Sequence, residues 1–385
     1  MIGHTNLRGS AAIVGIAEAA SPTGELPIRG RELEAAVIKA ALDDAGLTIA
    51  DVDGVAHPDS SLDLAEFLGL TPSFSESTYI GGSGFEMYVE NAAAAINAGL
   101  AETIVVVYAA TPRSDRKKGI GGWVERAGPR DEFEVPYGLG LLGSYALAAN
   151  RHQAVYGTTP EQLAAIAVAT REWAKFNPSA RFRESLTVDE VLASPMICSP
   201  LHMLDCCLVT DGAGAVVVTS AERARNLAKP PVYVLGTATA HSHNMIHAMP
   251  DLTVTPGALT GPRAMERAGI KPSDVGLLMG YDSFTITALL HLEDLGFVPK
   301  GEAGAFVAAG ETGPGGSLPM NTNGGGLSFT HPGMYGIFLL VEAARQLRGE
   351  AGERQLDGLE LAVAHGSGQF LSAMSTVVLG TEATL

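Results

Sequence analysis

The chain has few cysteines, few charges and no long apolar run. Its 385 residues contain only three cysteines, Cys198, Cys206 and Cys207. Three cysteines cannot make a disulfide framework, and cysteines adjacent in sequence rarely pair without strain, so a reducing cytoplasm fits best. The first apolar run, residues 11–16, is too short for a secretory signal and far too short to span a bilayer. We therefore expect a cytoplasmic protein with no membrane insertion.

Positive charge is scarce as well. Lysine and arginine number 25 against 42 acidic residues, which gives a formal net charge of -17. This balance disfavours nonspecific attraction to a polyanion, so we expect no nucleic-acid partner. The three cysteines also lack histidines at the spacing of a zinc site. We therefore expect no metal site in this chain.

Small and apolar residues are abundant instead. Hydrophobic residues make up 46% of the chain and glycine occurs 46 times, a composition typical of tightly turned α/β enzymes and not of disordered or fibrous chains. A length of 385 residues exceeds what one hydrophobic core normally supports. The composition therefore predicts two domains, or two halves packed closely together.

Strand and helix patterns alternate along the chain. We expect strands at 11–16, 52–56, 103–108, 212–219, 232–236, 275–279, 359–365 and 373–379, and helices at 30–45, 88–99, 159–175, 261–268, 284–295 and 333–347. This alternation predicts a mostly parallel sheet covered on both faces. Residues 111–204 break the rhythm with charged and glycine-rich loops, which indicates an inserted loop or cap domain. With a linker at 229–231, the predicted domains are 1–228 and 229–385.

Two glycine-rich motifs in the second half carry a family resemblance. Residues 321–326 read Asn-Thr-Asn-Gly-Gly-Gly, and residues 330–336 read Thr-His-Pro-Gly-Met-Tyr-Gly. They resemble the asparagine-glycine-glycine and glycine-histidine-proline motifs of thiolases and sterol-carrier-protein thiolases, and the resemblance extends over nearly the whole chain. It implies the thiolase fold: two similar βαβα halves in α/β/α/β/α layers, usually paired as a homodimer.

Both reactive cysteines of that family are absent here. Residues 80–84 read Ile-Gly-Gly-Ser-Gly where a thiolase carries its acyl-accepting thiol, and residues 364–368 read Ala-His-Gly-Ser-Gly where the family keeps a proton-shuttling cysteine. Claisen chemistry needs a thiolate to hold the acyl group, and serine is a poor substitute without an activating base. Ser83 has no evident partner in the sequence. The resemblance therefore predicts an enzyme that handles acyl-CoA without forming an acyl-cysteine.

The polar residues that remain in these motifs are the site candidates. The resemblance places Tyr281 where the family keeps a polar residue that organises an oxyanion, and His331 where an imidazole points at the thioester carbonyl. A phenol donates a hydrogen bond, or exchanges a proton if its pKa of about 10 is lowered, and an imidazole there stabilises an enolate. Tyr335 places a second hydroxyl nearby. The predicted catalytic residues are Tyr281, Tyr335 and His331, and the predicted substrate-binding residues are Ser83, Gly325, His365 and Ser367.

Enolate stabilisation needs no covalent nucleophile, so the sequence predicts retro-aldol cleavage of a β-hydroxyacyl-CoA. The pattern resembles thiolase-like lipid-transfer proteins of actinobacterial steroid degradation, some of which are aldolases that release propionyl-CoA from a 17-hydroxy steroid thioester. That resemblance implies an acyl-CoA substrate and no separate cofactor. It also implies a small partner protein with an OB-fold and often a zinc ribbon.

Two other functions stay open at this point. One is an acyltransferase or thiolase of unusual mechanism that uses Ser83, which would form a trappable acyl-enzyme. The other is a non-catalytic lipid or acyl-CoA carrier, or a scaffold subunit, in which Tyr281, Tyr335 and His331 are replaceable without loss of function.

Overall fold

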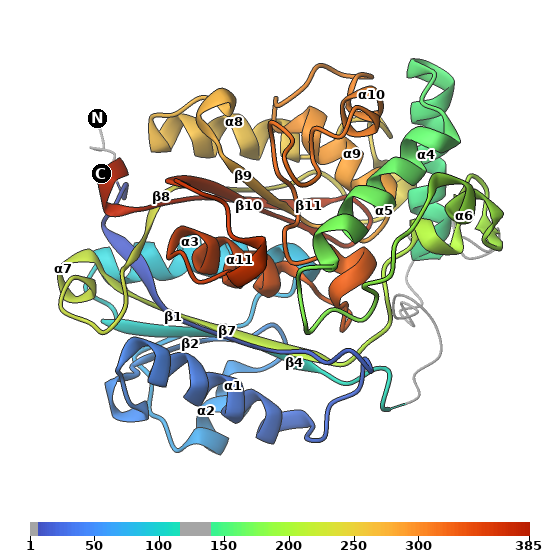
Figure 1. The fold of residues 1–385 in the computed structure, drawn as a ribbon. Helices are drawn as coiled ribbons and strands as arrows, with labels where there is room; N and C mark the ends of the chain where they lie inside the picture. The colour runs from blue at the N-terminus through green and yellow to red at the C-terminus, as the bar shows by residue number, and fades with distance from the viewer. Residues whose placement is uncertain (1–6, 116–139) are drawn as a thin grey trace.

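The computed structural model describes residues 7–115 and 140–385 (Figure 1). The strands are β1 Ala11–Ala19, β2 Gly54–Ala56, β3 Phe74–Glu76, β4 Thr103–Ala110, β5 Met196–Cys198, β6 Leu201–His202, β7 Gly212–Ser220, β8 Val232–His241, β9 Leu277–Gly280, β10 Leu361–Gly368 and β11 Ala373–Gly380. The α-helices are α1 Gly30–Ala45, α2 Ser61–Leu68, α3 Gly84–Asn97, α4 Leu141–Tyr156, α5 Pro160–Ala174, α6 Val188–Ala193, α7 Ala221–Ala224, α8 Gly257–Ala268, α9 Thr285–Asp294, α10 Ala303–Ala308 and α11 Gly336–Leu347.

The two halves of the chain repeat one strand order. Nine strands are hydrogen-bonded in the order β3-β2-β4-β7-β1-β8-β11-β10-β9. Counted from the centre outward, the first half places its strands as β1, β7, β4, β2 and the second half as β8, β11, β10, β9, which is the same order within each half. The halves join where the short pairing of Ala12 with Tyr233 and Ile13 with Val232 connects β1 to β8. This repeat confirms the predicted duplicated architecture.

A glycine at the fifth residue of the first strand marks the same duplication. A Cβ on Gly15 of β1 would overlap the backbone carbonyl of Ala41 in α1, and a Cβ on Gly236 of β8 would overlap the carbonyl of Ala264 in α8. Glycine is needed at both positions because the helix backbone packs directly on the strand. Each half thus begins with a strand and a helix in unusually close contact.

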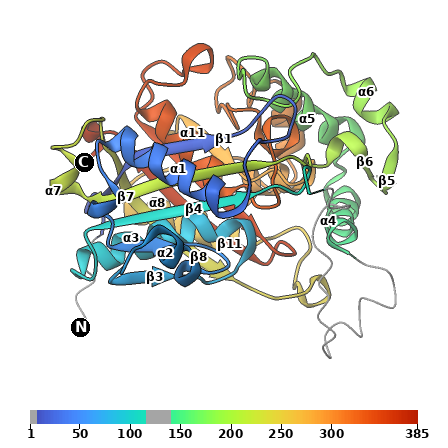
Figure 2. The same ribbon diagram turned by 90° about the horizontal axis from the view of Figure 1, so that it is seen from below.

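The elements stack in five layers (Figures 1 and 2). The helices α3 and α11 lie between the strands of the first half and those of the second, and contact strands of both. The helices α1 and α2 cover the outer face of one set of strands, and α8 and α9 cover the outer face of the other. The β-branched run of β4 suits this arrangement, because Val105 and Val107 pack in the α1 layer while Ile104 and Val106 pack in the central layer. The α/β/α/β/α layering predicted from the sequence is confirmed.

The prediction of a mostly parallel sheet is wrong. Among the described residues, the pairings β2·β3, β2·β4 and β9·β10 are parallel, whereas β4·β7, β7·β1, β1·β8, β8·β11 and β11·β10 are antiparallel. The reason is that the last strand of each half enters between two earlier strands and runs against both. Alternating helix and strand patterns specify layers but not the direction of such a closing strand.

The interrupting segment predicted at 111–204 supplies further helices at one end of the molecule. Its described part holds α4, α5, α6 and the β5–β6 hairpin, while residues 116–139 lie outside the described residues. The helix α5 matches the predicted helix at 159–175, but α4 was not predicted. Both helices pack on α9, and α5 also contacts the turn at residues 325–329. The insertion therefore lies beside the glycine-rich turn of the second half (Figure 1).

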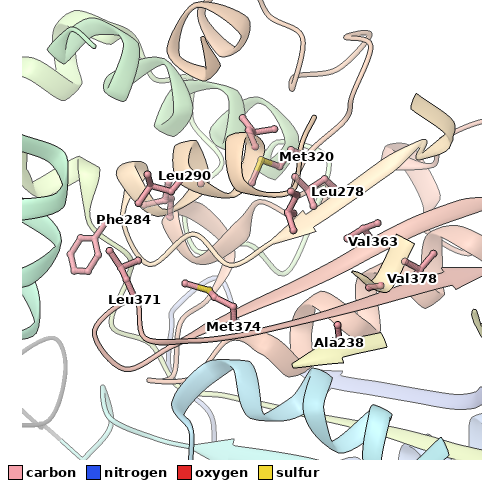
Figure 3. Close-up of a cluster of buried hydrophobic side chains, with 14 of the residues drawn as sticks. Ala238, Leu278, Phe284, Leu290, Met320, Val363, Leu371, Met374 and Val378 are labelled. Carbon is pink, nitrogen blue, oxygen red and sulfur yellow. The ribbon is translucent and has the colours of Figure 1, made fainter. Parts of the chain in front are cut away.

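Part of one large apolar core lies beneath α9 in the second half. Leu278, Val363 and Val378 project from adjacent strands toward Leu290 of α9, and Phe284 lies at the edge of this cluster near α4 (Figure 3). No helix in the described ranges, 7–115 and 140–385, is both long and apolar enough to cross a membrane. The boundary at 228/229 between the two predicted domains stays a prediction.

Candidate active site

The place of the missing thiol is closed by protein backbone. Gly81 has a φ of +70°, which disfavours any side chain, and a Cβ there would lie 2.9 Å from the amide nitrogen of Gln369 in the β10–β11 turn. A Cβ on Gly82 would overlap the ring of Tyr281. The turn itself holds Gln369 and Leu371 at φ of 58° and 60°, a backbone conformation that persists only where surrounding contacts impose it. A side chain at either glycine of this motif, Gly81 or Gly82, would therefore displace its neighbours.

Ser83 does not replace the thiol. Its side chain is fully buried, and its Oγ donates a hydrogen bond to the Ile80 carbonyl at 3.2 Å. A Cβ on Gly368 would lie 2.7 Å from that Oγ, so the hydroxyl is enclosed by backbone on this side too. An activated serine needs a base within hydrogen-bonding distance, and no base is bonded to Ser83 in the described part of the chain. Its predicted role in substrate binding stays a prediction.

Tyr281, His331 and Tyr335 come together in one buried cluster. Tyr281 follows β9, His331 follows the turn Gly325–Phe329, and Tyr335 directly precedes α11. The Tyr281 Oη and His331 Nε2 are hydrogen-bonded at 2.9 Å. The Tyr281 ring stands edge-on to both others, with centroids 5.7 Å from His331 and 5.9 Å from Tyr335. The structure thus brings together the three residues predicted to be catalytic.

Burial keeps this cluster uncharged. Removal from water lowers the pKa of His331 to about 4, so its imidazole is neutral at pH 7. Burial also raises the pKa of Tyr281 and Tyr335 well above the ordinary value for a phenol. The cluster therefore offers neutral hydrogen-bond donors and acceptors in a dry site, where a developing charge is stabilised more strongly than in water.

The asparagines of the 321–326 motif hold the cluster in place. Asn321 bonds both backbone groups of Gly280, with Oδ1 accepting from its amide at 2.9 Å and Nδ2 donating to its carbonyl at 2.8 Å. Asn323 Oδ1 accepts from Tyr335 Oη at 2.9 Å and from the amide of Gly325 at 3.0 Å. The motif thereby links the end of β9, which carries Tyr281, to the start of α11.

Asp282 is a site residue that the sequence reasoning missed. Its carboxylate accepts from the amides of Gly326 at 2.7 Å and Leu327 at 3.4 Å, at the start of the turn that leads to His331. A Cβ on Gly325 would overlap this carboxylate, so glycine is required there to admit Asp282. Burial raises the pKa of Asp282 to about 7. The structure places Gly325 against Asp282, and its predicted contact with substrate stays a prediction.

The structure separates His365 from the tyrosine cluster. The side chain of His365 lies on the outer face of β10, where its Nδ1 bonds Thr376 Oγ1 at 2.8 Å and its ring lies 4.4 Å from that of His291. Burial lowers the pKa of His365 to about 3. Only its backbone reaches the cluster, because its carbonyl accepts from the Tyr281 amide at 3.0 Å. The structure therefore does not bring the His365 side chain to His331.

Ser367 lies nearer to Tyr281. Its backbone carbonyl would be 2.8 Å from a Cβ on Gly82, the same glycine that the Tyr281 ring packs against. The Ser367 side chain is buried, and its Oγ has no hydrogen-bond partner among the described residues. Its predicted contact with substrate stays a prediction.

Glu86, the third residue of α3, was also missed. Both carboxylate oxygens are buried without a hydrogen-bond partner in the described ranges, and burial raises the pKa of this group to about 8. The carboxylate fills the space beside Gly336 and Gly366, where a Cβ on either residue would be too close to it. One signal was available in the sequence: Glu86 is an acid within an otherwise apolar stretch at the start of an expected helix.

The described residues hold no group of three or more histidine, cysteine, aspartate or glutamate side chains able to bind a metal ion. What the cluster offers instead is proton exchange between hydroxyl and imidazole groups, together with hydrogen bonds to a developing oxyanion. Neither process requires an acyl-enzyme.

Comparisons with known proteins extend over both halves. The family described as Thiolase C-terminal domain-like matches residues 238–381. An acetyl-CoA acetyltransferase of Methanothermobacter thermautotrophicus is 33% identical, covering 93% of this chain and 96% of its own. The 17-hydroxy-3-oxo-4-pregnene-20-carboxyl-CoA lyase of Mycobacterium tuberculosis is 36% identical, covering 89% and 92%. A solved structure, the Ltp2-ChsH2(DUF35) aldolase, superposes with a TM-score of 0.89 at 31% identity, covering 99% of this chain and all of that one.

Proposed function

This chain belongs to the thiolase superfamily, in the branch of thiolase-like lipid-transfer proteins and side-chain-cleaving aldolases, and we propose that it cleaves a β-hydroxyacyl-CoA by a retro-aldol reaction. The observation that carries the proposal is the closed nucleophile position. In the segment where a thiolase carries its thiol, a Cβ on Gly81 or Gly82 would meet neighbouring atoms, yet the neighbouring tyrosines and His331 form an intact polar cluster. Carbon-carbon cleavage through an enolate is the thioester chemistry that such a site supports without an acyl-enzyme.

The reaction has three balanced steps. The β-hydroxyl passes its proton to the Tyr281 oxygen as the Tyr281 hydrogen moves to the neutral imidazole of His331, to which Tyr281 is hydrogen-bonded. The bond between the α and β carbons then breaks, which leaves a ketone and a thioester enolate. The imidazolium that His331 has become stabilises the enolate oxygen, and the Tyr335 phenol adds a hydrogen bond once it turns from Asn323 Oδ1, to which it donates in this structure. The α carbon finally takes up one proton, so the first proton is accounted for.

The relatives suggest the substrate class. The lyase of Mycobacterium tuberculosis is named for a 17-hydroxy pregnene carboxyl-CoA. By analogy, this chain acts on a 17-hydroxy steroid side-chain thioester and releases a ketone plus propionyl-CoA. The substrate already carries CoA, so no separate cofactor is proposed.

Two partners are part of the proposal. A homodimer is supported by the outermost strand β3, whose outer edge pairs with no strand of residues 7–115 and 140–385, and by the exposed Leu62 and Tyr79 near it. A small OB-fold partner, with a zinc ribbon in many cases, is supported by the solved relative, the Ltp2-ChsH2(DUF35) aldolase, in which ChsH2(DUF35) is named together with Ltp2. The active assembly would then contain two copies of each chain and work in the cytoplasm.

A product assay tests the function. The chain, with and without its partner, is incubated with a 17-hydroxy steroid carboxyl-CoA, and ketone and propionyl-CoA are measured by mass spectrometry. Equal release of both is expected, and Tyr281→Phe or Tyr335→Phe should lower the rate by about 100-fold or more. Tyr233→Phe is the matched control, because this buried tyrosine of β8 lies outside the cluster. No ketone from the complete complex would overturn the steroid assignment.

The acyltransferase alternative keeps one supporting observation, the similarity to an acetyl-CoA acetyltransferase. It predicts an acyl group on Ser83 that intact-protein mass spectrometry would detect with simple acyl-CoA substrates. The enclosed Ser83 hydroxyl argues against it. A carrier or scaffold would instead keep its function in the tyrosine variants.

A further inference from the structure

The loop that carries His331 is held by side chains from the first half of the chain. Thr210, just before β7, accepts a hydrogen bond from the His331 amide through its Oγ1 at 2.8 Å. The amide of Thr210 donates to the His331 carbonyl at 3.4 Å, so one residue bonds both backbone groups of the histidine. Tyr108 of β4 donates from its Oη to the carbonyl of the next residue, Pro332, at 2.8 Å. The position of the imidazole therefore depends on the first half.

The Thr210 hydroxyl belongs to a chain of hydrogen bonds with one direction. The Oγ1 atoms of Thr210 and Thr330 are hydrogen-bonded at 2.8 Å, and Thr330 donates to the carbonyl of Asp211 at 3.2 Å. Because Thr330 uses its one hydroxyl hydrogen on this carbonyl, Thr210 is the donor between the two hydroxyls. The Thr210 oxygen accepts from the His331 amide. Both threonines are buried, and the hydrogen of each hydroxyl is used.

The backbone beside Thr210 is itself fixed. Asp211 follows it directly and is fully buried. The Asp211 carboxylate accepts from the amides of Leu26 and Ser114, each at 3.0 Å. The Asp211 amide donates to the carbonyl of Gly24 at 2.8 Å. Three bonds to other segments of the first half thus hold the support on which His331 rests.

The position of His331 matters because a proton crosses a single hydrogen bond. Its Nε2 lies 2.9 Å from the Tyr281 Oη, and the Tyr281 hydrogen moves across this gap in the proposed reaction. A group that exchanges a proton has to lie within about 2.6–3.2 Å of its partner, and a displacement of about 1 Å costs on the order of 100-fold in rate. Tyr281 is held by the second half, because its amide donates to the His365 carbonyl at 3.0 Å. The two halves therefore position the two partners separately.

We propose that Thr210, supported by Thr330, is a positioning residue that holds the His331 imidazole against Tyr281. The Thr210 hydroxyl is used on Thr330 and on the His331 amide, so it acts through His331 and not on the substrate. The inference rests on the proposed function, because the proton transfer is a step of that reaction. The geometry that it predicts is measurable without turnover.

Nitrogen NMR of the imidazole tests the geometry. The complete complex carries isotopically labelled histidine, and the His331 Nε2 resonance is identified by its absence in His331→Asn. Thr210→Val keeps the shape and removes the hydroxyl, so it should move this resonance toward its position in Tyr281→Phe, where the bond is lost. Thr210→Ser keeps the hydroxyl and should leave the wild-type resonance. Thr219→Val is the matched control, because this buried threonine of β7 donates to the carbonyl of Glu102 at 2.7 Å, away from the cluster.

Kinetics of ketone release supply the second measurement. Thr210→Val should lower kcat by about 10-fold or more and leave KM unchanged, because the displaced group acts in the chemical step and not in binding. Thr210→Ser should stay within about 3-fold of the wild-type kcat. A purely structural role would instead lower the stability of Thr210→Val and leave the kcat of the folded protein unchanged.

The outcomes separate the positioning role from the function. A wild-type Nε2 resonance in Thr210→Val, or a shifted resonance with an unchanged kcat, overturns the positioning role. A loss of kcat that Thr210→Ser shares overturns it too. A shifted resonance without any ketone from the wild-type complex supports the positioning and overturns the retro-aldol reaction. If circular dichroism shows that Thr210→Val does not fold, Thr330→Val removes only the supporting hydroxyl and is decided by the same criteria.

Discussion

The two central helices carry buried glutamates in opposite electrostatic states. The helices α3 and α11 occupy corresponding places in the two halves: α3 connects the edge strand β3 to β4, and α11 precedes β10 after the edge strand β9. Glu342 of α11 bonds Arg354 through both oxygens, at 2.8 and 2.9 Å, and also pairs with Arg345 at 3.0 Å. Glu86 of α3 has no hydrogen-bond partner in the described part of the chain. The charge of Glu342 is balanced by arginines, whereas Glu86 has no such partner.

The difference shows in their pKa values. Burial acts to raise the pKa of Glu342, but the hydrogen bonds and charges of Arg354 and Arg345 outweigh it, and the pKa lies below the ordinary value. At Glu86 no arginine offsets burial, which is the dominant effect and raises its pKa to about 8. Glu86 also lies beside Ser83 and Gly336, next to the tyrosine cluster. Strongly perturbed groups are typical of functional sites, whereas Glu342 belongs to a structural ion-pair network.

Removing the charge of Glu342 should have the largest effect on stability. Glu342→Gln leaves Arg354 buried without its anion, and breaking a buried pair in this way costs about 3–5 kcal/mol of unfolding free energy. Urea denaturation at pH 7 measures the loss, with exposed Glu66→Gln as control. A loss below about 1 kcal/mol would show that the network does not stabilise the fold.

The same substitution at Glu86 should raise the free energy of unfolding instead of lowering it. Because the folded pKa is about 8 and the ordinary value 4.5, the folded state binds more protons than the unfolded state between these limits. Wild-type stability therefore falls as pH rises through this window, by roughly 1 kcal/mol per pH unit. Glu86→Gln removes this dependence, so its stability advantage should be larger at pH 8.5 than at pH 5.5. Equal differences at the two pH values would contradict an uncompensated Glu86.

A methyl group against Glu86 should have a moderate effect. In Gly366→Ala the new Cβ would overlap the Glu86 carboxylate and lie 2.7 Å from Ser83 Cα. Overpacking of this kind costs about 1–3 kcal/mol. Gly313→Ala, whose Cβ meets only an ordinary contact at 3.5 Å, is the control. Equal stability of the two variants in thermal unfolding would contradict the close packing around Glu86.

The smallest expected effect concerns pH and His331. With a pKa of about 4, the imidazole stays neutral down to pH 5.5, so kcat/KM should show no inflection from this group near pH 6.5. Because the folded pKa of His331 lies below the ordinary value of 6.5, the unfolded state takes up the proton first as pH falls. The stability that this neutral imidazole contributes is therefore present above pH 6.5 and is lost as pH falls toward 4. A pH-rate profile of the retro-aldol reaction checks this. An inflection near pH 6.5 that disappears in His331→Asn would show that His331 is protonated near pH 6.5 and would contradict a neutral imidazole in a site without water.

The sequence predicted the layers of the fold and the Tyr281–His331–Tyr335 cluster better than it predicted which face of a strand a side chain occupies or in which direction a strand runs. The β-branched run of β4 and the motifs around His331 were readable because burial on both faces and glycine-rich turns leave local patterns. The role of His365 was not readable, because residues 365 and 366 of β10 point to opposite faces of the sheet. Gly366 faces Glu86 and His365 faces His291. A shift of one residue decides which side chain meets the site.

Two other features required the folded chain. Tyr145 lies on α4, more than 130 residues from Tyr281 in sequence, and the packing of α4 against Phe284 brings its hydroxyl to the carbonyl of Gln369 in the β10–β11 turn. Asp282 was visible beside Tyr281, but its bonds to the amides of Gly326 and Leu327 depend on contacts between separate segments. Long-range contacts of this kind leave no periodic signal in one sequence.

The most direct test of the account is cleavage in deuterium oxide. The wild-type chain with its partner is given a 17-hydroxy steroid carboxyl-CoA, and the small molecules and the intact protein are weighed. A retro-aldol reaction yields ketone and propionyl-CoA in equal amounts, with solvent deuterium on the α carbon and unmodified protein. Propionyl-CoA without deuterium, or an acyl group bound to Ser83, would contradict cleavage through an enolate without an acyl-enzyme.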